Sequence, residues 1–134
     1  MKKSIINKSH LYTSTEDKSS LETYLKRSIK DKNIIICKSE YHREITDSIT
    51  YDIINNFDAK QRKSVVIINA PGTFELPFCI KLVMEKYATK KKKNPLIFIA
   101  VGCVIKGETK HDEYISSTVI NALRNLSLEY NVPI

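Results

Sequence analysis

The chain has 134 residues, of which 42% are hydrophobic and 28% are charged, a composition typical of one globular domain without a membrane-spanning run. Its net charge of +7 comes mainly from lysine, with arginine only at four positions, and this argues against arginine-based recognition of nucleic acid. The three cysteines lie far apart and pair with no histidine at metal-ligand spacing, which excludes a typical zinc site or disulfide framework.

Residues 1–32 are rich in serine, lysine, threonine and aspartate and show little periodicity. We predict an irregular or mobile segment there, with one short helix near Leu21 to Ile29. The basic residues at the start are not followed by the apolar stretch of a secretory signal. The sequence therefore predicts a cytoplasmic protein, with organellar targeting by this segment left open.

Three short apolar runs follow, at 33–37, 64–69 and 96–101. Each run is rich in β-branched residues and continuous rather than alternating, which is typical of a strand covered on both faces. A helical pattern follows each run. This alternation predicts βαβ units that form a parallel sheet with helices on both faces, in one domain that extends from residue 33 to residue 134.

The predicted helices differ in how they begin. Pro77 stands where a first helical turn tolerates proline, and Thr109 with Asp112 resembles a capping box before the last helix. The apolar stripes predicted to face the sheet consist of Ile45, Ile49, Ile53 and Phe57 in the first helix, Phe78, Leu82, Val83 and Tyr87 in the second, and Ile115, Val119, Ala122, Leu123, Leu126 and Tyr130 in the third.

Ligands of open parallel sheets bind at the carboxyl ends of the strands, where this chain has loops at 38–44, 69–75 and 102–110. In the third loop, residues 107–109 precede a helix whose free N–H groups favour an anion, although an ordinary helix cap explains them equally well. His111 opens that helix, either as a general acid or base or as a surface histidine without a task.

The other two loops carry residues suited to a flat, hydroxylated ligand. Gly72 lets a ligand approach the backbone, and Glu75 either accepts hydrogen bonds from hydroxyl groups or complements a helix dipole. In the first loop, Tyr41 stacks on a flat ring while His42 bonds to its edge, or Tyr41 is simply a half-exposed tyrosine.

Two loop sequences together resemble the lumazine synthase family. Residues 71–77 read PGTFELP, which resembles the family element P-G-(A/S/T)-(F/Y)-E-(I/L)-P, and residues 102–111 read GCVIKGETKH, which resembles G-x-V-I-(K/R)-G-x-T-x-H. The resemblance extends from about Asn33 to Ile134. It implies a flavodoxin-like α/β/α fold in three layers, with a parallel sheet of order 2-1-3-4 whose fourth strand is expected to be largely missing here.

This resemblance implies a transferase of riboflavin biosynthesis that needs no metal and no cofactor. The family condenses 5-amino-6-ribitylaminouracil with 3,4-dihydroxy-2-butanone 4-phosphate to give 6,7-dimethyl-8-ribityllumazine. Carried over by position, His111 resembles the catalytic acid–base residue, and His42 stands where the family commonly has asparagine. The implied phosphate-binding residues are Gly107, Glu108 and Thr109, and the implied substrate-binding residues are Tyr41, His42, Gly72, Thr73, Phe74, Glu75, Val104, Ile105 and Lys106.

The family resemblance also bears on assembly and on competing functions. Family members form pentamers, some of them packed into 60-mers, so it implies a homo-oligomer without nucleic-acid or membrane partners. Beyond the position of Ile134 the family has further elements, including an arginine that holds the phosphate, and these are expected to be absent here. Two alternatives therefore stand: a homologue that binds ligand but catalyses weakly or not at all, and a lysine-rich nucleic-acid-binding module.

Overall fold

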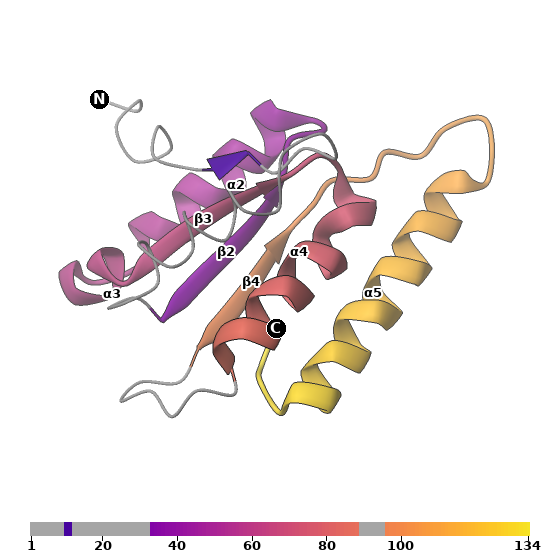
Figure 1. Ribbon diagram of the computed structural model, residues 1–134. Helices are drawn as coiled ribbons and strands as arrows, with labels where there is room; N and C mark the ends of the chain where they lie inside the picture. Colours follow the sequence, from indigo (N-terminus) through magenta and orange to yellow (C-terminus); the bar gives the residue numbers. More distant parts are fainter. Residues whose placement is uncertain (1–9, 12–32, 89–95) are drawn as a thin grey trace.

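The computed structural model describes residues 10–11, 33–88 and 96–134 (Figure 1). The short helix predicted near Leu21 to Ile29 lies outside these residues. Within the segment predicted to be irregular, the described residues His10–Leu11 form strand β1, which pairs with a neighbouring strand. The sequence pattern did not predict this pairing. No helix in the described part of the chain has the length and apolar character to cross a membrane.

The described strands form one parallel sheet in the order β1-β3-β2-β4. Strand β2 (Ile34–Ser39) lies between β3 (Val65–Ala70) and β4 (Ile97–Val101). Every residue of β2 is buried, as expected for a strand covered on both faces. The three predicted strands therefore occur in the 2-1-3 order that the family resemblance implied, and β1 adds to the sheet beside β3.

Helices cover both faces of the sheet, so the predicted three-layer architecture is confirmed (Figure 1). Helix α2 (Arg43–Asn55) lies on one face, while α4 (Leu76–Val83) and α5 (His111–Tyr130) lie on the other. The short helix α3 (Ala59–Lys63) follows α2, the 3-10 turn η2 (Thr73–Glu75) precedes α4, and the π-helix η3 (Met84–Ala88) continues it.

The strands supply side chains to two hydrophobic cores. From β2, Ile35 and Cys37 pack in the core beneath α4 and α5, whereas Ile34 and Ile36 pack in the core beneath α2. This division follows from the two-residue repeat of a strand, which sends successive side chains to opposite faces. Because β2 runs parallel to both β3 and β4, the carboxyl ends of these strands lie at one edge of the sheet, where the three loops meet.

The apolar stripe predicted for α2 is correct in part, because Ile53 and Phe57 pack against the core beneath this helix, whereas the first two members of the stripe do not. The residues of α2 buried against the sheet are Thr46, Thr50 and Ile54, whereas Ile45 and Ile49 are 43% and 40% exposed. Threonine is tolerated inside because each hydroxyl has a partner: Thr46 Oγ1 donates to the Ser39 carbonyl and Thr50 Oγ1 to the Thr46 carbonyl, both at 2.7 Å. A buried hydroxyl that is hydrogen-bonded avoids the penalty of desolvation.

The stripe predicted for α4 is correct in part. Val83 is buried and Leu82 packs against the core, but Phe78 is half-exposed. Pro77 lies in the first turn of α4, as predicted. The side chain of Tyr87 lies outside the described structure.

The stripe predicted for α5 is confirmed, because Val119 and Leu126 are buried and Leu123 and Tyr130 pack against the core. The predicted capping box at the start of α5 does not form. The helix begins at His111 with Lys110 as N-cap residue and has no side-chain cap. Thr109 lies one position too early, and its hydroxyl contacts the ring of His111 instead.

Candidate active site

A cavity of about 410 Å³ lies where the loops after β2, β3 and β4 meet. It takes in every predicted site residue except Glu108 and Thr109, which lie exposed in the loop beside it. Two lining residues were missed: Cys103 occupies the variable position of the third loop element, and Ile115 lies one helical turn beyond His111, on the same helix face. The lining residues are Tyr41, His42, Gly72, Thr73, Phe74, Glu75, Cys103, Val104, Ile105, Lys106, Gly107, His111 and Ile115.

A larger cavity of about 560 Å³ lies between β4 and α5. Its lining is mainly apolar, and Arg124 is its only charged residue. It holds no pair of groups suited to proton transfer. The smaller cavity at the strand ends combines an imidazole, a carboxylate, an ammonium group and an aromatic ring, so it is the better candidate for an active site.

The loop after β2 turns sharply at Tyr41 and His42. His42 has φ 57° and ψ 46°, a left-handed conformation that costs most residues about 1 kcal/mol but that histidine and asparagine adopt more readily. Tyr41 is 65% exposed, and its ring lies edge-on to that of His42, with ring centroids 4.3 Å apart. An exposed ring face beside an imidazole suits a planar ligand with polar edges.

The loops after β3 and β4 are in direct contact. Thr73 Oγ1 donates a hydrogen bond of 3.2 Å to the Cys103 carbonyl. Gly102 makes this approach possible, because a Cβ atom at its position would lie only 2.8 Å from Thr73 Cγ2. A Cβ atom at Gly72 would lie 2.9 Å from Glu75 Oε2, so the carboxylate of Glu75 rests against bare backbone on the cavity wall.

His111 is the first residue of α5 and directly follows the third loop. Its Nδ1 lies 2.5 Å from Thr109 Oγ1, and its Cε1 lies 3.9 Å from the position of a Cβ atom at Gly107. With Nδ1 engaged by the hydroxyl group, Nε2 is the ring nitrogen that remains for exchange of a proton with a ligand. The first turn of α5, whose N–H groups have no partner within the helix, adjoins the same loop, so an imidazole and groups able to bind an anion lie side by side.

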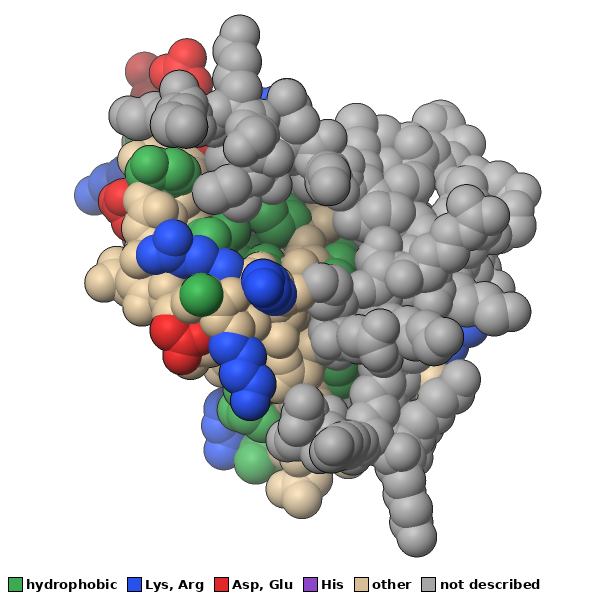
Figure 2. All heavy atoms as spheres, turned by 90° about the vertical axis from the view of Figure 1, so that its left-hand side faces the viewer, with side chains coloured by type: hydrophobic (Ala, Val, Ile, Leu, Met, Phe, Trp, Pro, Cys, Tyr) green, Lys and Arg blue, Asp and Glu red, His purple; other side chains and the backbone are tan. Residues whose placement is uncertain are grey.

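The basic side chains on the face of α3 do not all form an open patch. Figure 2 shows Lys and Arg side chains on the face at the left of Figure 1, interrupted by apolar and acidic side chains. Arg62, in α3, donates from Nε to the Phe57 carbonyl and from NH2 to the Asn55 carbonyl, both at 2.8 Å. Its guanidinium group thereby completes the end of α2, which is a structural role.

Among residues 10–11, 33–88 and 96–134, no three His, Cys, Asp or Glu side chains gather in an arrangement that would hold a metal ion.

Comparison with known proteins gives a consistent match. A family model described as 6,7-dimethyl-8-ribityllumazine synthase matches residues 31–134. Relatives that carry this name include proteins of Buchnera aphidicola subsp. Baizongia pistaciae, 34% identical over 77% of this chain and 63% of the relative, and of Archaeoglobus fulgidus, 34% identical over 72% and 63%. A third, from Saccharolobus islandicus (strain L.S.2.15 / Lassen #1), is 32% identical over 74% of this chain and 60% of the relative. The chain thus spans about three fifths of the length of the curated relatives it matches.

Proposed function

Because the chain belongs to the 6,7-dimethyl-8-ribityllumazine synthase family, we propose that it condenses 5-amino-6-ribitylaminouracil with 3,4-dihydroxy-2-butanone 4-phosphate. The products are 6,7-dimethyl-8-ribityllumazine, inorganic phosphate and two molecules of water. The observation that carries the proposal is the single cavity in which residues of all three loops meet. Its volume of about 410 Å³ falls in the range of small-molecule sites, about 300–1,000 Å³.

In this proposal the pyrimidine ring lies against Tyr41. The exposed tyrosine ring provides a stacking surface, and His42, held edge-on to it, bonds to a polar edge of the heterocycle. Val104 and Ile105 line the cavity from the third loop, and their backbone groups contact the heterocycle. The position of Tyr41 at the end of a buried strand limits how far the stacking surface can move.

The ribityl chain is proposed to lie along the second loop. Glu75 accepts hydrogen bonds from its hydroxyl groups, and Gly72, Thr73 and Phe74 form the surrounding wall. The close approach of the Glu75 carboxylate to Gly72 leaves its oxygens at the surface of the cavity. A carboxylate accepts several hydroxyl hydrogen bonds at once, and charged acceptors form the stronger ones.

His111 is proposed to move the protons of the reaction through Nε2. Imine formation releases water when a proton is supplied to the leaving hydroxyl group, phosphate elimination needs a proton removed from carbon, and ring closure releases a second water. Because an imidazole both donates and accepts a proton, one histidine can serve both directions of transfer. The phosphate is proposed to bind near Gly107, Glu108 and Thr109 at the start of α5, with Lys106 adding positive charge.

The direct test mixes the folded chain with both substrates and follows the fluorescence of the lumazine product. His111→Ala should lower kcat by about 10²- to 10⁴-fold while leaving the affinity for 5-amino-6-ribitylaminouracil nearly unchanged. Glu129→Ala, an exposed change near the other end of α5, is the control and should retain wild-type activity. Absence of product from folded wild-type chain would reject the proposal. Binding without turnover would favour the alternative of a ligand-binding homologue.

We further propose that the chain assembles with copies of itself. Family resemblance to pentameric enzymes supports this, and so do exposed apolar side chains at the cavity rim, including Phe74 and Ile105, and on α4 at Phe78. Exposed aromatic groups of this kind are enriched in protein interfaces. Native mass spectrometry at micromolar concentration tests the assembly, and a strictly monomeric species would contradict it.

A further inference from the structure

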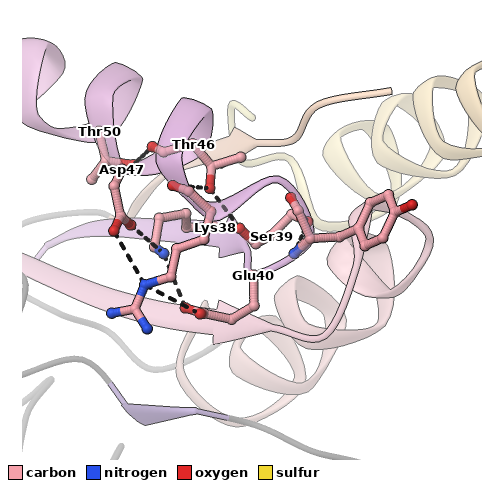
Figure 3. A network of polar contacts seen from close by, with 8 residues as sticks. Lys38, Ser39, Glu40, Thr46, Asp47 and Thr50 are labelled. Carbon is pink, nitrogen blue, oxygen red and sulfur yellow. Dashed lines mark hydrogen bonds and ion pairs between the residues drawn. The ribbon is translucent and has the colours of Figure 1, made fainter. Parts of the chain in front are cut away.

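A buried lysine stands at the carboxyl end of β2. The Lys38 side chain is 0% exposed, and its Nζ lies 2.6 Å from Asp47 Oδ1 and 3.0 Å from Glu40 Oε1. Arg43 Nε lies 3.2 Å from Asp47 Oδ2 and 3.6 Å from Glu40 Oε2. We call these four residues the corner network. Figure 3 shows the Lys38 side chain directed toward Asp47 on α2.

The corner network spans the turn that carries two residues of the cavity wall. Glu40 immediately precedes Tyr41 and His42, while Asp47 lies in α2 just after them, so the Lys38 ammonium group ties together both sides of the turn. Neither Lys38 nor its two carboxylate partners lines the cavity. The cavity residues next to the corner network in the chain are Tyr41 and His42, so they are the residues through which Lys38 can act on a ligand without touching it.

Local hydrogen bonds fix the same turn from within. The Tyr41 N–H donates to Ser39 Oγ at 3.1 Å, and Ser39 Oγ donates to the Tyr41 carbonyl at 3.2 Å. Thr46 Oγ1 donates to the Ser39 carbonyl at 2.7 Å (Figure 3). A left-handed residue such as His42 persists where surrounding contacts over-determine the backbone, and these bonds together with the corner network provide that constraint.

The arrangement is unsuited to a purely stabilising role. Removing a lysine from water is costly, and a buried ion pair is commonly no more stable than apolar side chains of similar volume. The pair does impose a defined geometry, because a short contact with two carboxylates leaves the turn few alternatives. Without Lys38, only Arg43 among the residues that the structure describes would hold the two carboxylates. Arg43 is 59% exposed, so its ion pairs are weakened by solvent screening.

We propose that Lys38 is a positioning residue that holds Tyr41 and His42 in the orientation in which they meet the ligand. This inference rests on the proposed function, since that function assigns the pyrimidine ring to these two residues. An effect of Lys38 is also expected in the protein without ligand. The backbone of the turn should be ordered by Lys38, so that its removal loosens Tyr41 and His42 while the centre of β2 keeps its order.

The test compares Lys38→Met, which keeps an unbranched side chain one atom shorter than lysine and removes its charge, with Lys81→Met. Lys81 is an exposed α4 residue that pairs with Glu85 at 3.7 Å, so it controls for loss of one ammonium group. Lys38→Met should raise KM for 5-amino-6-ribitylaminouracil by about tenfold, and change kcat and KM for the phosphate-bearing substrate by less than about twofold. Lys81→Met should match the wild type in all three constants.

Amide hydrogen exchange provides the readout that is independent of ligand. Exchange of Tyr41 and His42 should accelerate in Lys38→Met, while that of Ile36 at the centre of β2 stays unchanged. If wild-type chain does not bind 5-amino-6-ribitylaminouracil, the proposed function fails, and the exchange experiment still decides the role of Lys38. Unchanged exchange at Tyr41 and His42 overturns the inference, as does wild-type KM in a chain that binds the substrate.

Should Lys38→Met fail to fold, Asp47→Asn replaces it. This variant removes one partner of the ammonium group at a position that is 24% exposed, where the loss of charge is more easily accommodated. The same selective rise in KM and the same acceleration of exchange are expected, each smaller in size. A folded Asp47→Asn chain with wild-type values in both experiments would overturn the inference.

Discussion

Gly102→Ala tests the contact between the second and third loops of the cavity. The added Cβ atom would lie 2.8 Å from Thr73 Cγ2, 2.9 Å from Thr73 Oγ1 and 3.1 Å from Leu76 Cδ1, and the first two separations are too short without movement. Thr73 is not free to retreat, because its hydroxyl donates to the Cys103 carbonyl. The substitution should therefore push the two loops apart at the cavity wall.

The expected loss in free energy of unfolding follows from these contacts. Overpacking typically costs about 1–3 kcal/mol, and loss of the Thr73 hydrogen bond costs about 0.5–1.5 kcal/mol. Replacing glycine also lowers the conformational entropy of the unfolded chain, which raises the free energy of unfolding by about 0.4–1 kcal/mol. The net destabilisation should be about 2 kcal/mol. For Gly107→Ala the nearest atom is His111 Cε1 at 3.9 Å, so no clash arises and stability should stay equal or rise.

Urea unfolding at 25 °C, followed by circular dichroism, measures both variants. Gly102→Ala should lower the midpoint without changing the slope, whereas Gly107→Ala should not lower it. The double variant Gly102→Ala/Thr73→Ala removes both clashing atoms, so its loss should be smaller than the sum of the two single losses. Wild-type stability of Gly102→Ala, or strict additivity in the double variant, would refute the steric reasoning.

Three further predictions concern thiol reactivity, stability in alkaline solution and a helix cap. A hydrogen bond with Cys79, together with burial, raises the pKa of the Cys37 thiol well above its ordinary value. The half-buried Cys103 should therefore react before Cys37 with a thiol reagent in the folded protein. Equal reaction rates at Cys37 and Cys103 would contradict this. The free energy of unfolding that this raised pKa contributes is fully present below the ordinary thiol pKa, about 8.5, and is lost as pH rises above it. In Cys37→Ala, the free energy of unfolding measured with urea should therefore fall less steeply in alkaline solution than in the wild type. In the capping box of α3, the Asp58 carboxylate accepts a hydrogen bond from the Gln61 N–H at 2.7 Å. Asp58→Ala should therefore lower the free energy of unfolding in urea by about 1 kcal/mol, and Asp58→Asn, which retains an acceptor, should lower it much less. Equal losses in the two variants would exclude capping as the cause.

Much of the site was predictable because its position depends on topology. Parallel strands end at one edge of their sheet, and the three apolar runs identified those strands. The loops that follow them therefore had to meet, which is how residues as distant as Tyr41 and His111 come to line one cavity. The roles assigned to these residues remain predictions until the catalytic test is made.

Apolar periodicity was less informative about which side of a helix is buried. Moving isoleucine from water to an apolar environment is more favourable than moving threonine, so the pattern favoured Ile45 and Ile49 as the buried face of α2. Thr46 and Thr50 occupy that face because carbonyl oxygens of Ser39 and Thr46 accept their hydroxyl hydrogen bonds. The carbonyl partner of Thr46 belongs to the preceding strand, a contact that no helical pattern contains.

By itself the sequence determined strands β2, β3 and β4, the helices α2, α4 and α5 that follow them and the set of loops at the cavity, since these follow from local periodicity and from the chain direction of a parallel sheet. It did not determine β1. Only the tertiary structure decided that Thr109 contacts His111 instead of capping α5, and that Lys38 lies buried between Glu40 and Asp47. A lysine in a strand is ordinarily expected at the surface. Its burial becomes tolerable only when the fold brings two carboxylates within reach of its ammonium group.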